Sequence, residues 1–442
     1  MSASFSNPGC MRLALAVAAC LLGEILAPVP AHAQSADTTP PQCVPPSTGM
    51  SLCAQVGARL FFDNNLSASR QMSCASCHNP NNHYAQSNTT PVQYGGPTLA
   101  APGFRAVPTL TYKQLTPAYS DDALNPDGIS ANGPGGGFTW DGRANTLAEQ
   151  AAIPLLSSFE MANTNAAAVV AAVQSSSYAA LFQQTWGANI FNDPDTAFTD
   201  IGLSLQSYQL EDPDFHPFTA KYDYVVTVAL SNGLPVQLTA AEVRGFNVAQ
   251  NPNGGNCFAC HFNGQPVGGN GAIFTDFTFE AIGVPRNNNI PADATRLGLP
   301  PLYYDLGLCT AQNPTTPHTL PASAQYCGMF KTPTLRNVAS RKVFFHNGVF
   351  NNLVDVINWY NTRDTNPSAW YPTVNGVVQK FNDLPPAYRA NLDSVDVPFD
   401  GLPVGGTPHM SAQDVADLKC FLETLTDGYV QGVTAQDPNC IN

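Results

Sequence analysis

Small and apolar residues recur at intervals of three and four along several segments of the chain, which is the spacing of an amphipathic helix. The segment SLCAQVGARLFF, residues 51–62, follows this spacing and predicts a helix. Four more helices are predicted in the first half of the chain, at residues 144–152, 163–175, 178–186 and 196–210. The expected fold is therefore mainly α.

Capping sequences mark helix starts in the second half. Thr239-Ala-Ala-Glu242 opens a helix that should run to about Gln250, and Ser411, with an acidic residue three positions on, opens one at 412–426. A third helix is predicted at 352–361. Its apolar positions form an i, i+3, i+4, i+7 stripe, which normally faces a core: Leu353, Val356, Ile357 and Tyr360.

Long segments between these helices favour turns. Residues 111–139 and 262–330 are rich in Pro, Gly and Asn and predict irregular loops, the first of them on the surface. The chain has 38 Pro and 34 Gly, but 44% of its residues are hydrophobic, so loops between helices are expected rather than disorder. The net charge of -14 argues against nucleic acid as a partner.

The N-terminus has the features of an export signal. Arg12 precedes the apolar run LALAVAACLLG, and Ala31-His32-Ala33 offers a small-residue cleavage site before Gln34. Val17 to Cys20 also resembles a lipoprotein box, which leaves lipidation as an alternative. No later stretch is apolar and long enough to span a bilayer, so the protein is expected to be periplasmic, with no membrane span.

Two Cys-x-x-Cys-His pentapeptides, Cys74 to His78 and Cys257 to His261, carry the clearest chemistry. This pattern is the attachment signature of a c-type haem, in which both thiols form thioethers and the histidine supplies an axial nitrogen to the iron. A zinc knuckle or a thioredoxin-like cysteine pair would need a different context. Two covalently bound haem c groups are therefore expected.

The spacing of the two motifs suggests two domains, because a chain of this length exceeds a single core. A linker is expected near residues 231–235. The predicted division is a signal peptide at 1–33, an N-terminal linker at 34–50, an N-terminal cytochrome c domain at 51–232, a C-terminal cytochrome c domain at 236–430 and a tail at 431–442.

Six other cysteines remain in the exported chain, and an oxidising compartment favours disulfides among them. Proximity in sequence suggests three pairs, although six cysteines allow 15 pairings. The suggested pairs are Cys43 with Cys53, Cys309 with Cys327, and Cys420 with Cys440.

Three segments resemble the bacterial dihaem cytochrome c peroxidases and their MauG-type relatives. They are RLFFDNNLSASRQMSCASCHNP around the first haem motif, FTWDGRANTLAEQAAIPLLSSFEMANT at 138–164 and FKTPTLRNVASRKVFFHNGVF at 330–350. The resemblance implies two cytochrome c-like domains whose haems face a shared interface, and a reaction with hydrogen peroxide.

The same resemblance assigns the peroxide pocket. Gln150 and Glu160 stand ten residues apart, as the family pattern requires, and Trp140 takes the place of an aromatic between the haems. Arg105 is a further candidate for the pocket or for a haem propionate. Taken without the resemblance, Glu160 would be a solvated helix-end carboxylate and Trp140 a core residue.

The second axial ligand of the second haem is assigned by motif spacing. The peroxidases carry a methionine fourteen residues after the histidine of the FHxG motif, and MauG-type proteins carry a tyrosine there. Here that histidine is His346, so the position is Tyr360; Met329 and Met410 are the alternatives. A phenolate ligand favours Fe(III) and higher oxidation states, whereas a thioether favours Fe(II).

The chain departs from the family at three further positions. The peroxidases hold a removable histidine over the first haem, but Tyr94 aligns with it, and His83 is too near His78 to cross to the distal face. The first haem is therefore expected to accept peroxide without reductive activation. Two ligand positions of the family's interdomain calcium hold Ala106 and Arg341, which makes calcium doubtful; Arg341 can supply positive charge instead.

The favoured function is a periplasmic dihaem peroxidase that reduces hydrogen peroxide with electrons from a small cytochrome c or copper protein. A MauG-type oxidase that modifies side chains of a partner protein is the first alternative. A non-catalytic dihaem electron-transfer cytochrome is the second, and Gln150, Glu160 and Trp140 argue against it.

Overall fold

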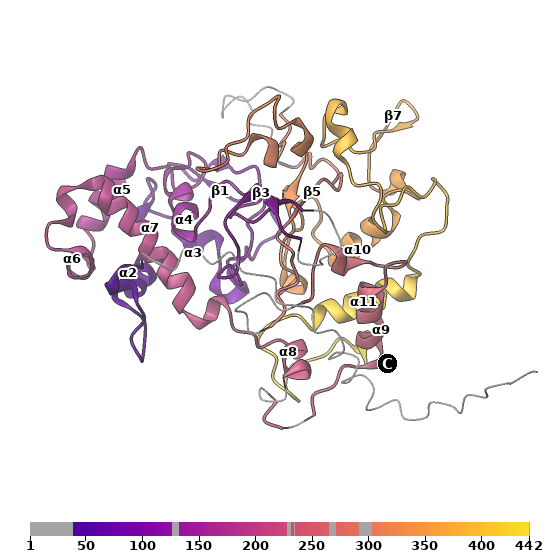
Figure 1. Cartoon of the computed structure of the whole chain (residues 1–442), viewed down its shortest axis with the longest axis horizontal. Helices are drawn as coiled ribbons and strands as arrows, with labels where there is room; N and C mark the ends of the chain where they lie inside the picture. Colours follow the sequence, from indigo (N-terminus) through magenta and orange to yellow (C-terminus); the bar gives the residue numbers. More distant parts are fainter. Residues whose placement is uncertain are drawn as a thin grey trace, which may run out of the picture.

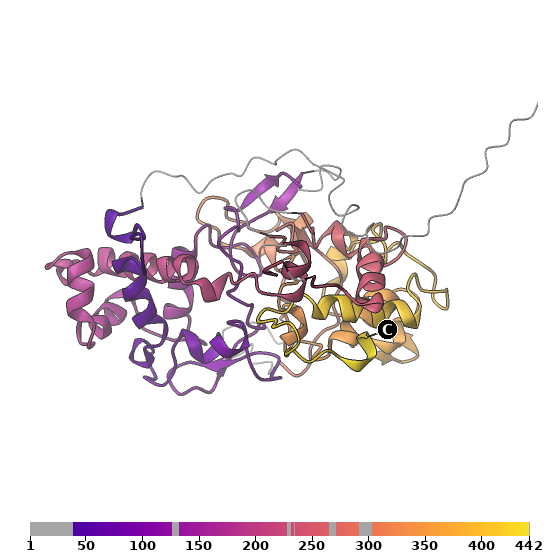
Figure 2. The same ribbon diagram turned by 90° about the horizontal axis from the view of Figure 1, so that it is seen from below.

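The computed structural model describes residues 39–125, 132–227, 231–233, 235–264, 271–290 and 303–441. Figure 1 shows two groups of helices on either side of a middle layer of loops and short strands, and Figure 2 shows the same groups side by side from below. Helix makes up 37% of the structure and strand 7%, so the prediction of a mainly α fold is confirmed. The expected signal peptide lies outside the described residues.

The first group forms from residues 52–211, and capping side chains set the helix starts. Ser51 accepts a hydrogen bond from the Ala54 amide at 3.1 Å, and Asp193 accepts one from the Thr196 amide at 3.2 Å. The helices are α2 (Leu52–Phe61), α3 (Cys74–Cys77), α4 (Leu147–Leu156), α5 (Ala166–Gln174), α6 (Ala179–Trp186) and α7 (Pro194–Glu211).

The second group uses the caps expected from the sequence. Thr239 and Glu242 form a reciprocal capping box, and so do Ser411 and Asp414. The helices are α8 (Lys221–Val226), α9 (Ala240–Gln250), α10 (Leu353–Thr362) and α11 (Ala412–Glu423).

The strands are short and pair as two-stranded antiparallel ribbons. Their pairs are β1 (Tyr94–Gly95) with β2 (Ala101–Pro102), β3 (Ser120–Ala123) with β4 (Gly133–Gly135), β5 (Phe279–Glu280) with β6 (Phe330–Lys331), and β7 (Thr373–Val374) with β8 (Val377–Val378). The Lys331 amide of β6 donates to the Trp140 carbonyl at 2.9 Å, which ties the second half to the first.

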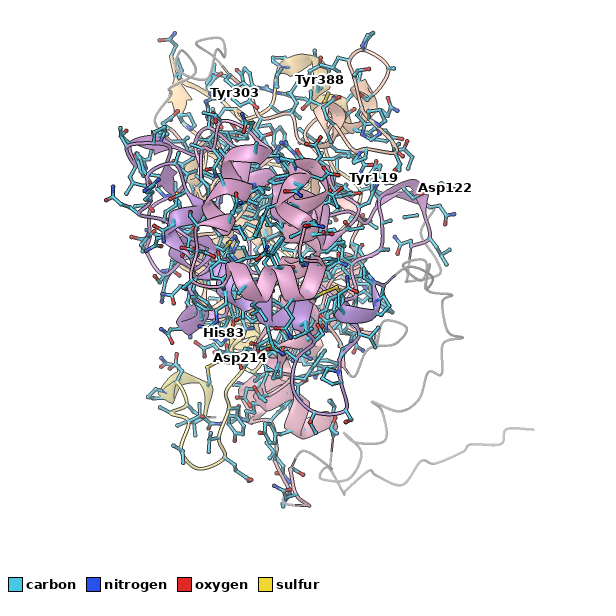
Figure 3. All side chains as sticks on the ribbon, turned by 90° about the vertical axis from the view of Figure 1, so that its left-hand side faces the viewer. His83, Tyr119, Asp122, Asp214, Tyr303 and Tyr388 are labelled. Atoms are coloured by element: carbon cyan, nitrogen blue, oxygen red, sulfur yellow. A yellow bond between two sulfur atoms is a disulfide. The ribbon has the colours of Figure 1, made fainter. Side chains whose placement is uncertain are left out.

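Several helix ends and one loop differ from the prediction: the helix expected at 163–175 begins at Ala166, and the one expected at 412–426 ends at Glu423. The helix expected at 144–152 begins only at Leu147, because Thr146 caps it and the preceding residues close a turn. The segment 111–139 is not only a surface loop. Strand β3 is exposed at Asp122, which lies at the edge of the molecule in Figure 3, but Tyr112 and Tyr119 are buried. They fill the space between the halves, where the Tyr112 hydroxyl donates to Asp427 at 2.7 Å.

Each half is built around one helix crossing that requires a glycine. A Cβ on Gly57 of α2 would overlap the Ser204 carbonyl of α7, and a Cβ on Gly245 of α9 would overlap the Asp417 carbonyl of α11. In each half, the helix that precedes the haem motif (α2 or α9) therefore packs directly on the backbone of the last helix (α7 or α11).

The position of the domain boundary stays a prediction. α8 precedes the expected linker, yet it packs on the second core: the Tyr222 amide donates to the Thr424 carbonyl at 3.0 Å, and the Lys221 ammonium lies 2.7 Å from Glu242. Arg336 forms a buried pair with Asp223 of the same helix at 2.6 Å. These contacts attach α8 to the C-terminal half.

All three suggested disulfides are present, so the pairing by proximity is confirmed. The Cα separations are 4.9 Å for Cys43–Cys53, 4.8 Å for Cys309–Cys327 and 5.4 Å for Cys420–Cys440. The four remaining described cysteines, those of the two haem motifs, are free. Within the described residues, no helix combines the length and apolar character needed to cross a membrane.

Replacing Gly245 by alanine should destabilise the second half, because the new methyl group must push α9 away from α11. We expect a loss of about 1–3 kcal/mol in the free energy of unfolding, measured by denaturant titration of the haem-loaded protein. Gly133→Ala is the control, since a Cβ at that position would meet no atom within 4 Å and its φ is not positive. Equal stability of the two variants would contradict the crossing argument.

Candidate active site

The first haem motif lies at the end of α3, where His78 follows the helix. Its amide donates to the Cys74 carbonyl at 2.9 Å, and its ring Nδ1 lies 3.0 Å from the Tyr84 carbonyl. Burial lowers the pKa of His78 to about 4. The imidazole is therefore neutral, with Nδ1 donating its proton to the backbone and Nε2 left as a lone-pair donor for a metal.

The second motif repeats this arrangement. The His261 amide donates to the Cys257 carbonyl at 2.8 Å, and Nδ1 lies 3.3 Å from the Phe274 carbonyl. Burial also lowers the pKa of His261 to about 4. Two histidines held in the same tautomer by backbone carbonyls are what axial ligation through Nε2 requires.

The four motif thiols lie in environments that oppose ionisation. Burial raises the pKa of Cys74, Cys77 and Cys257 to about 12, and that of Cys260 well above its ordinary value. Such a setting disfavours thiolate ligation of a metal but suits an uncharged thioether. The residues present therefore fit covalently bound haem c at both motifs.

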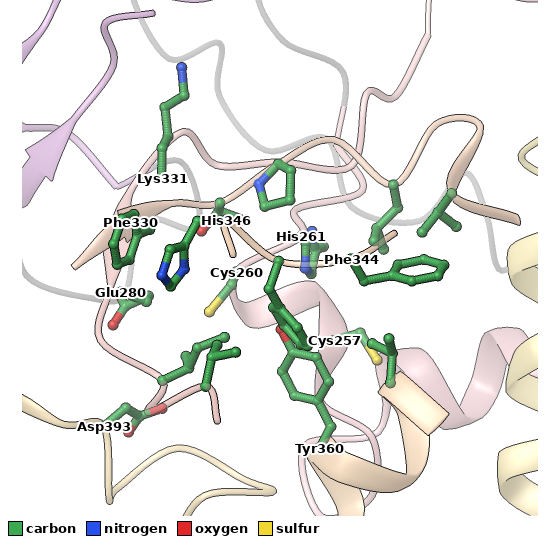
Figure 4. A pocket seen from close by; sticks show the side chains of 18 of the residues that line it. Cys257, Cys260, His261, Glu280, Phe330, Lys331, Phe344, His346, Tyr360 and Asp393 are labelled. Carbon is green, nitrogen blue, oxygen red and sulfur yellow. The ribbon is translucent and has the colours of Figure 1, made fainter. Parts of the chain in front are cut away.

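A mainly apolar cavity opens beside the second motif. Figure 4 shows the Tyr360 phenol extending from α10 into this cavity, toward the side that holds His261 and the two cysteines. Leu353, Val356 and Ile357 of the same stripe also line it. The stripe thus faces the core, as its periodicity predicts, and its last member presents an oxygen to the haem site. Burial raises the pKa of Tyr360 far above its ordinary value, so a phenolate there needs a cation beside it.

The two methionine alternatives differ in position. Met329 packs with Tyr119, Phe279 and Leu308, in a cluster apart from the haem cavity. Met410 lines the cavity itself, and Asn361 fixes its backbone through hydrogen bonds of 2.8 and 2.9 Å. Among the methionines weighed from the sequence, Met410 therefore competes with Tyr360 better than Met329 does.

Trp140 also lines the second cavity, although it comes from the first half of the chain. Its indole Nε1 donates to the Ala106 carbonyl at 2.8 Å, and the Ala106 amide donates to the His346 carbonyl at 2.6 Å. The next two carbonyls face other residues: Val107 accepts from Arg341 Nη2 at 3.0 Å, and the Pro108 carbonyl lies close enough to the His78 ring to raise its pKa. The segment 106–108 thereby joins Trp140, Arg341 and His78 of the first haem motif.

Glu160 lies near the first motif. It follows α4, and its charge raises the pKa of both Cys74 and Cys77. Burial raises the pKa of Glu160 itself, with Arg143 acting in the opposite sense. Gly95 allows this packing, since a Cβ there would lie 2.6 Å from the Glu160 carbonyl oxygen. Gln150 is half-buried on α4, the helix that precedes Glu160.

Arg105 is bound by two carboxylates. Its guanidinium contacts Asp305 through Nε at 2.6 Å and Asp141 through Nη1 at 2.8 Å, so its donors serve an ion-pair network between the halves. Asp141 also accepts from Arg143 Nε at 2.9 Å. Asp141 and Asp305 hold the pKa of Arg105 above its ordinary value despite burial.

The structure also shows where Tyr94, Ala106 and Arg341 lie, the three positions that depart from the family pattern, and where His83 lies. Tyr94 is 45% exposed. His83, labelled in Figure 3, directly precedes Tyr84, whose carbonyl contacts His78, so it stays on the proximal side. Ala106 presents only a methyl group, which is 1% exposed, and Arg341 a guanidinium, where calcium would need oxygen ligands.

Several charged residues of the second cavity were not found from the sequence, and Glu280 and Lys113 are examples. Glu280 lines the cavity, and burial followed by repulsion from Asp393 raises its pKa to about 8. Lys113 lines it from the first half of the chain. Each is a single charged residue in a segment without a repeating pattern, so no sequence signal marks it.

Together these features define a protein with two c-type haem sites, each with carboxyl groups close by, joined by a short backbone segment and an indole. The family model for dihaem cytochrome c peroxidases matches residues 52–228. The methylamine utilization protein MauG of Paracoccus denitrificans is 35% identical over 85% of this chain and 88% of its own length. The cytochrome c551 peroxidase of Nitrosomonas europaea is 27% identical over 67% of this chain and 68% of its own.

The solved structure of the dihaem peroxidase BthA from Burkholderia thailandensis superposes with a TM-score of 0.74 at 35% identity, covering 85% of this chain and 86% of that one. The chain therefore belongs to the dihaem cytochrome c peroxidase and MauG family. It is an oxidoreductase of a family that acts on hydrogen peroxide. The resemblance seen in the sequence is confirmed.

We propose Tyr360 as the second axial ligand at the His261 site. Tyr360→Phe removes one oxygen and should change the ferric visible and electron paramagnetic resonance spectra of one haem, with two haems per chain retained. Tyr388→Phe, outside the cavity lining, should leave them unchanged. If the spectra of Tyr360→Phe are unchanged and those of Met410→Leu are altered, Met410 and not Tyr360 is the ligand.

Proposed function

We propose that this protein is a periplasmic dihaem peroxidase that reduces hydrogen peroxide to water with electrons from a small cytochrome c or copper protein. The observation that carries the proposal is the half-buried carboxyl group of Glu160 beside the first haem motif. The two haems supply, when bound, two irons that can together provide the two electrons that heterolytic cleavage of an O–O bond requires.

The role assigned to Glu160 is proton transfer. Peroxide must lose a proton from its inner oxygen and gain one on its outer oxygen, and a buried carboxylate can accept the first and donate the second. A raised pKa suits this work, because a more basic carboxylate takes up the first proton more readily. Gln150, ten residues earlier on α4, is assigned to orient the substrate through its amide.

Trp140 is assigned to electron exchange between the two sites. Its ring lines the second cavity, while its Nε1 is bonded to the segment that also contacts His78. This position favours a role for Trp140 in electron exchange over a role in core packing alone. The indole is half-buried. It belongs neither to the buried cluster around Phe61 in the first half nor to the one around Phe421 in the second half.

Export to the periplasm is supported by the predicted signal at residues 1–33 and by the three disulfides, which persist in an oxidising compartment. The exposed Tyr94 supports a first haem whose distal face is open in the resting protein.

A MauG-type oxidase is the second candidate, and Tyr360 favours it. A phenolate ligand stabilises oxidised iron and would let the second site store oxidising equivalents for a protein substrate. The 35% identical relative from Paracoccus denitrificans carries the name of that class.

Steady-state kinetics with hydrogen peroxide and a reduced small cytochrome c should show sustained turnover. Poor turnover with such donors, combined with peroxide-dependent oxidation of tyrosine or tryptophan on a partner protein, would instead support the MauG-type reaction. A ferric protein whose spectrum does not respond to peroxide would leave only electron transfer and would overturn both.

Glu160→Gln should lower kcat/KM for peroxide by about a hundredfold or more, the usual contribution of a proton-transfer group. Because the pKa of Glu160 is raised, the carboxylate protonates at a higher pH than an ordinary glutamate. The wild-type rate should therefore fall as the pH drops through this pKa, and the variant should lose that dependence.

Asp195→Asn is the matched control, since Asp195 is an exposed carboxylate in the first turn of α7. It should retain both the rate and the pH profile. A Glu160→Gln enzyme with an unchanged acid limb would show that another group carries the proton.

A further inference from the structure

Two cations line the second haem cavity without an acidic partner. Lys113 comes from the first half of the chain and Arg341 from the second. Within the described ranges, no carboxylate forms an ion pair with either of them, and no hydrogen bond is found for the Lys113 ammonium. Arg341 has only carbonyl partners, Val107 at 3.0 Å and Val343 at 3.3 Å.

This arrangement is electrostatically unfavourable as it stands. Burial, followed by repulsion from Arg341, lowers the pKa of Lys113 to about 8, and burial lowers that of Arg341 to about 10. Other arginines in the protein interior have partners: Arg336 pairs with Asp223, and Arg105 with Asp141 and Asp305. Two half-buried, desolvated cations that repel each other and have no counter-charge among the described residues form a favourable place for an anion that is not part of the polypeptide.

The pair also lies between the two haem sites. Both cations line the cavity of the second site, and both lower the pKa of His78 in the first. Arg341 is bonded to the Val107 carbonyl, next to the Pro108 carbonyl that contacts His78. One positive region therefore acts on both sites at once.

The charge distribution in the cavity indicates how an anion would lie. Glu280, Asp393 and Asp396 line it from segments of the second half, and Figure 4 shows Glu280 and Asp393 on the same side. These carboxyl groups would repel another carboxylate. Lys113 and Arg341 attract one, and the two propionates are the only anionic groups on haem c.

We propose that Lys113 and Arg341 form a binding site for propionate of the haem attached at Cys257 and Cys260, and that this pair raises the reduction potentials of both haems. The inference rests on the two haems of the proposed function but not on peroxide turnover. Positive charge near an iron favours the reduced state, since reduction adds a negative charge. A single cation pair would then shift the reduction potentials of both haems in the same direction.

Lys331, a third cation of the cavity lining, is not included. Its ammonium donates to the Gly137 carbonyl, and Figure 4 shows its side chain directed away from Tyr360 and His261.

The test is a spectroelectrochemical titration of the haem-loaded protein. In Lys113→Gln and in Arg341→Gln, both potentials should fall, each by at least a tenfold change in the equilibrium constant for reduction, which is about 59 mV for one electron. Lys113→Arg and Arg341→Lys keep the charge and should restore most of the shift. Lys342→Gln removes an exposed charge from the neighbouring position and should leave both potentials unchanged.

Unaltered potentials in both neutral variants would overturn the proposal, and a shift confined to the second haem would overturn the claim of a shared pair. Haem content and far-ultraviolet circular dichroism establish that each variant is folded. Added inorganic phosphate should not move the wild-type potentials. If it does, a free anion rather than a propionate occupies the pair, and the propionate assignment fails. A protein without peroxide turnover can still show the predicted shifts, so the two proposals fail separately.

Discussion

Two consecutive carbonyls, at residues 106 and 107, connect the two halves of the molecule. One accepts from the Trp140 indole of the first half and the next from Arg341 of the second half, while the neighbouring Pro108 carbonyl lies close enough to the His78 ring to raise its pKa. Because these groups belong to one short peptide segment, the tryptophan, the cation and the histidine of the first haem motif are held near one another. The Ala106 amide adds a link to His346 at 2.6 Å, so the second half is held by the same segment.

Some of the cations around this segment form ion pairs with carboxylates and others do not. Arg105 and Arg143 surround Asp141, and Arg105 also bridges to Asp305, which stabilises the contact between the halves. Lys113 and Arg341, which also come one from each half, have no acidic partners among the described residues. Buried ion pairs are costly to break, whereas unpaired buried cations are costly to keep. The first set therefore stabilises the architecture, and the second provides a place for a charged group supplied from outside the polypeptide.

Local signals predicted most of the helices and both haem motifs. Capping at Thr239 and Ser411, and the fixed spacing of each Cys-x-x-Cys-His motif, involve neighbours in sequence, so the chain itself specifies them. Features that depend on contacts between the halves could not be predicted in this way. Tyr112 lies in a segment predicted as a surface loop, yet its side chain is buried. Its hydroxyl donates a hydrogen bond to Asp427, which is far away in sequence. The positions of Met329 and Met410 relative to the second cavity likewise follow from tertiary packing.

The glycine crossings of α2 with α7 and of α9 with α11 set an order for assembly. In each half the cysteine motif lies shortly after the earlier helix of the crossing, α2 or α9, whereas the helix that closes the crossing comes more than a hundred residues later. During synthesis the thiols therefore emerge well before the surface that will bury them is complete. A chain organised in this way leaves a time window in which a large porphyrin can reach its cysteines without any part of a finished domain having to open.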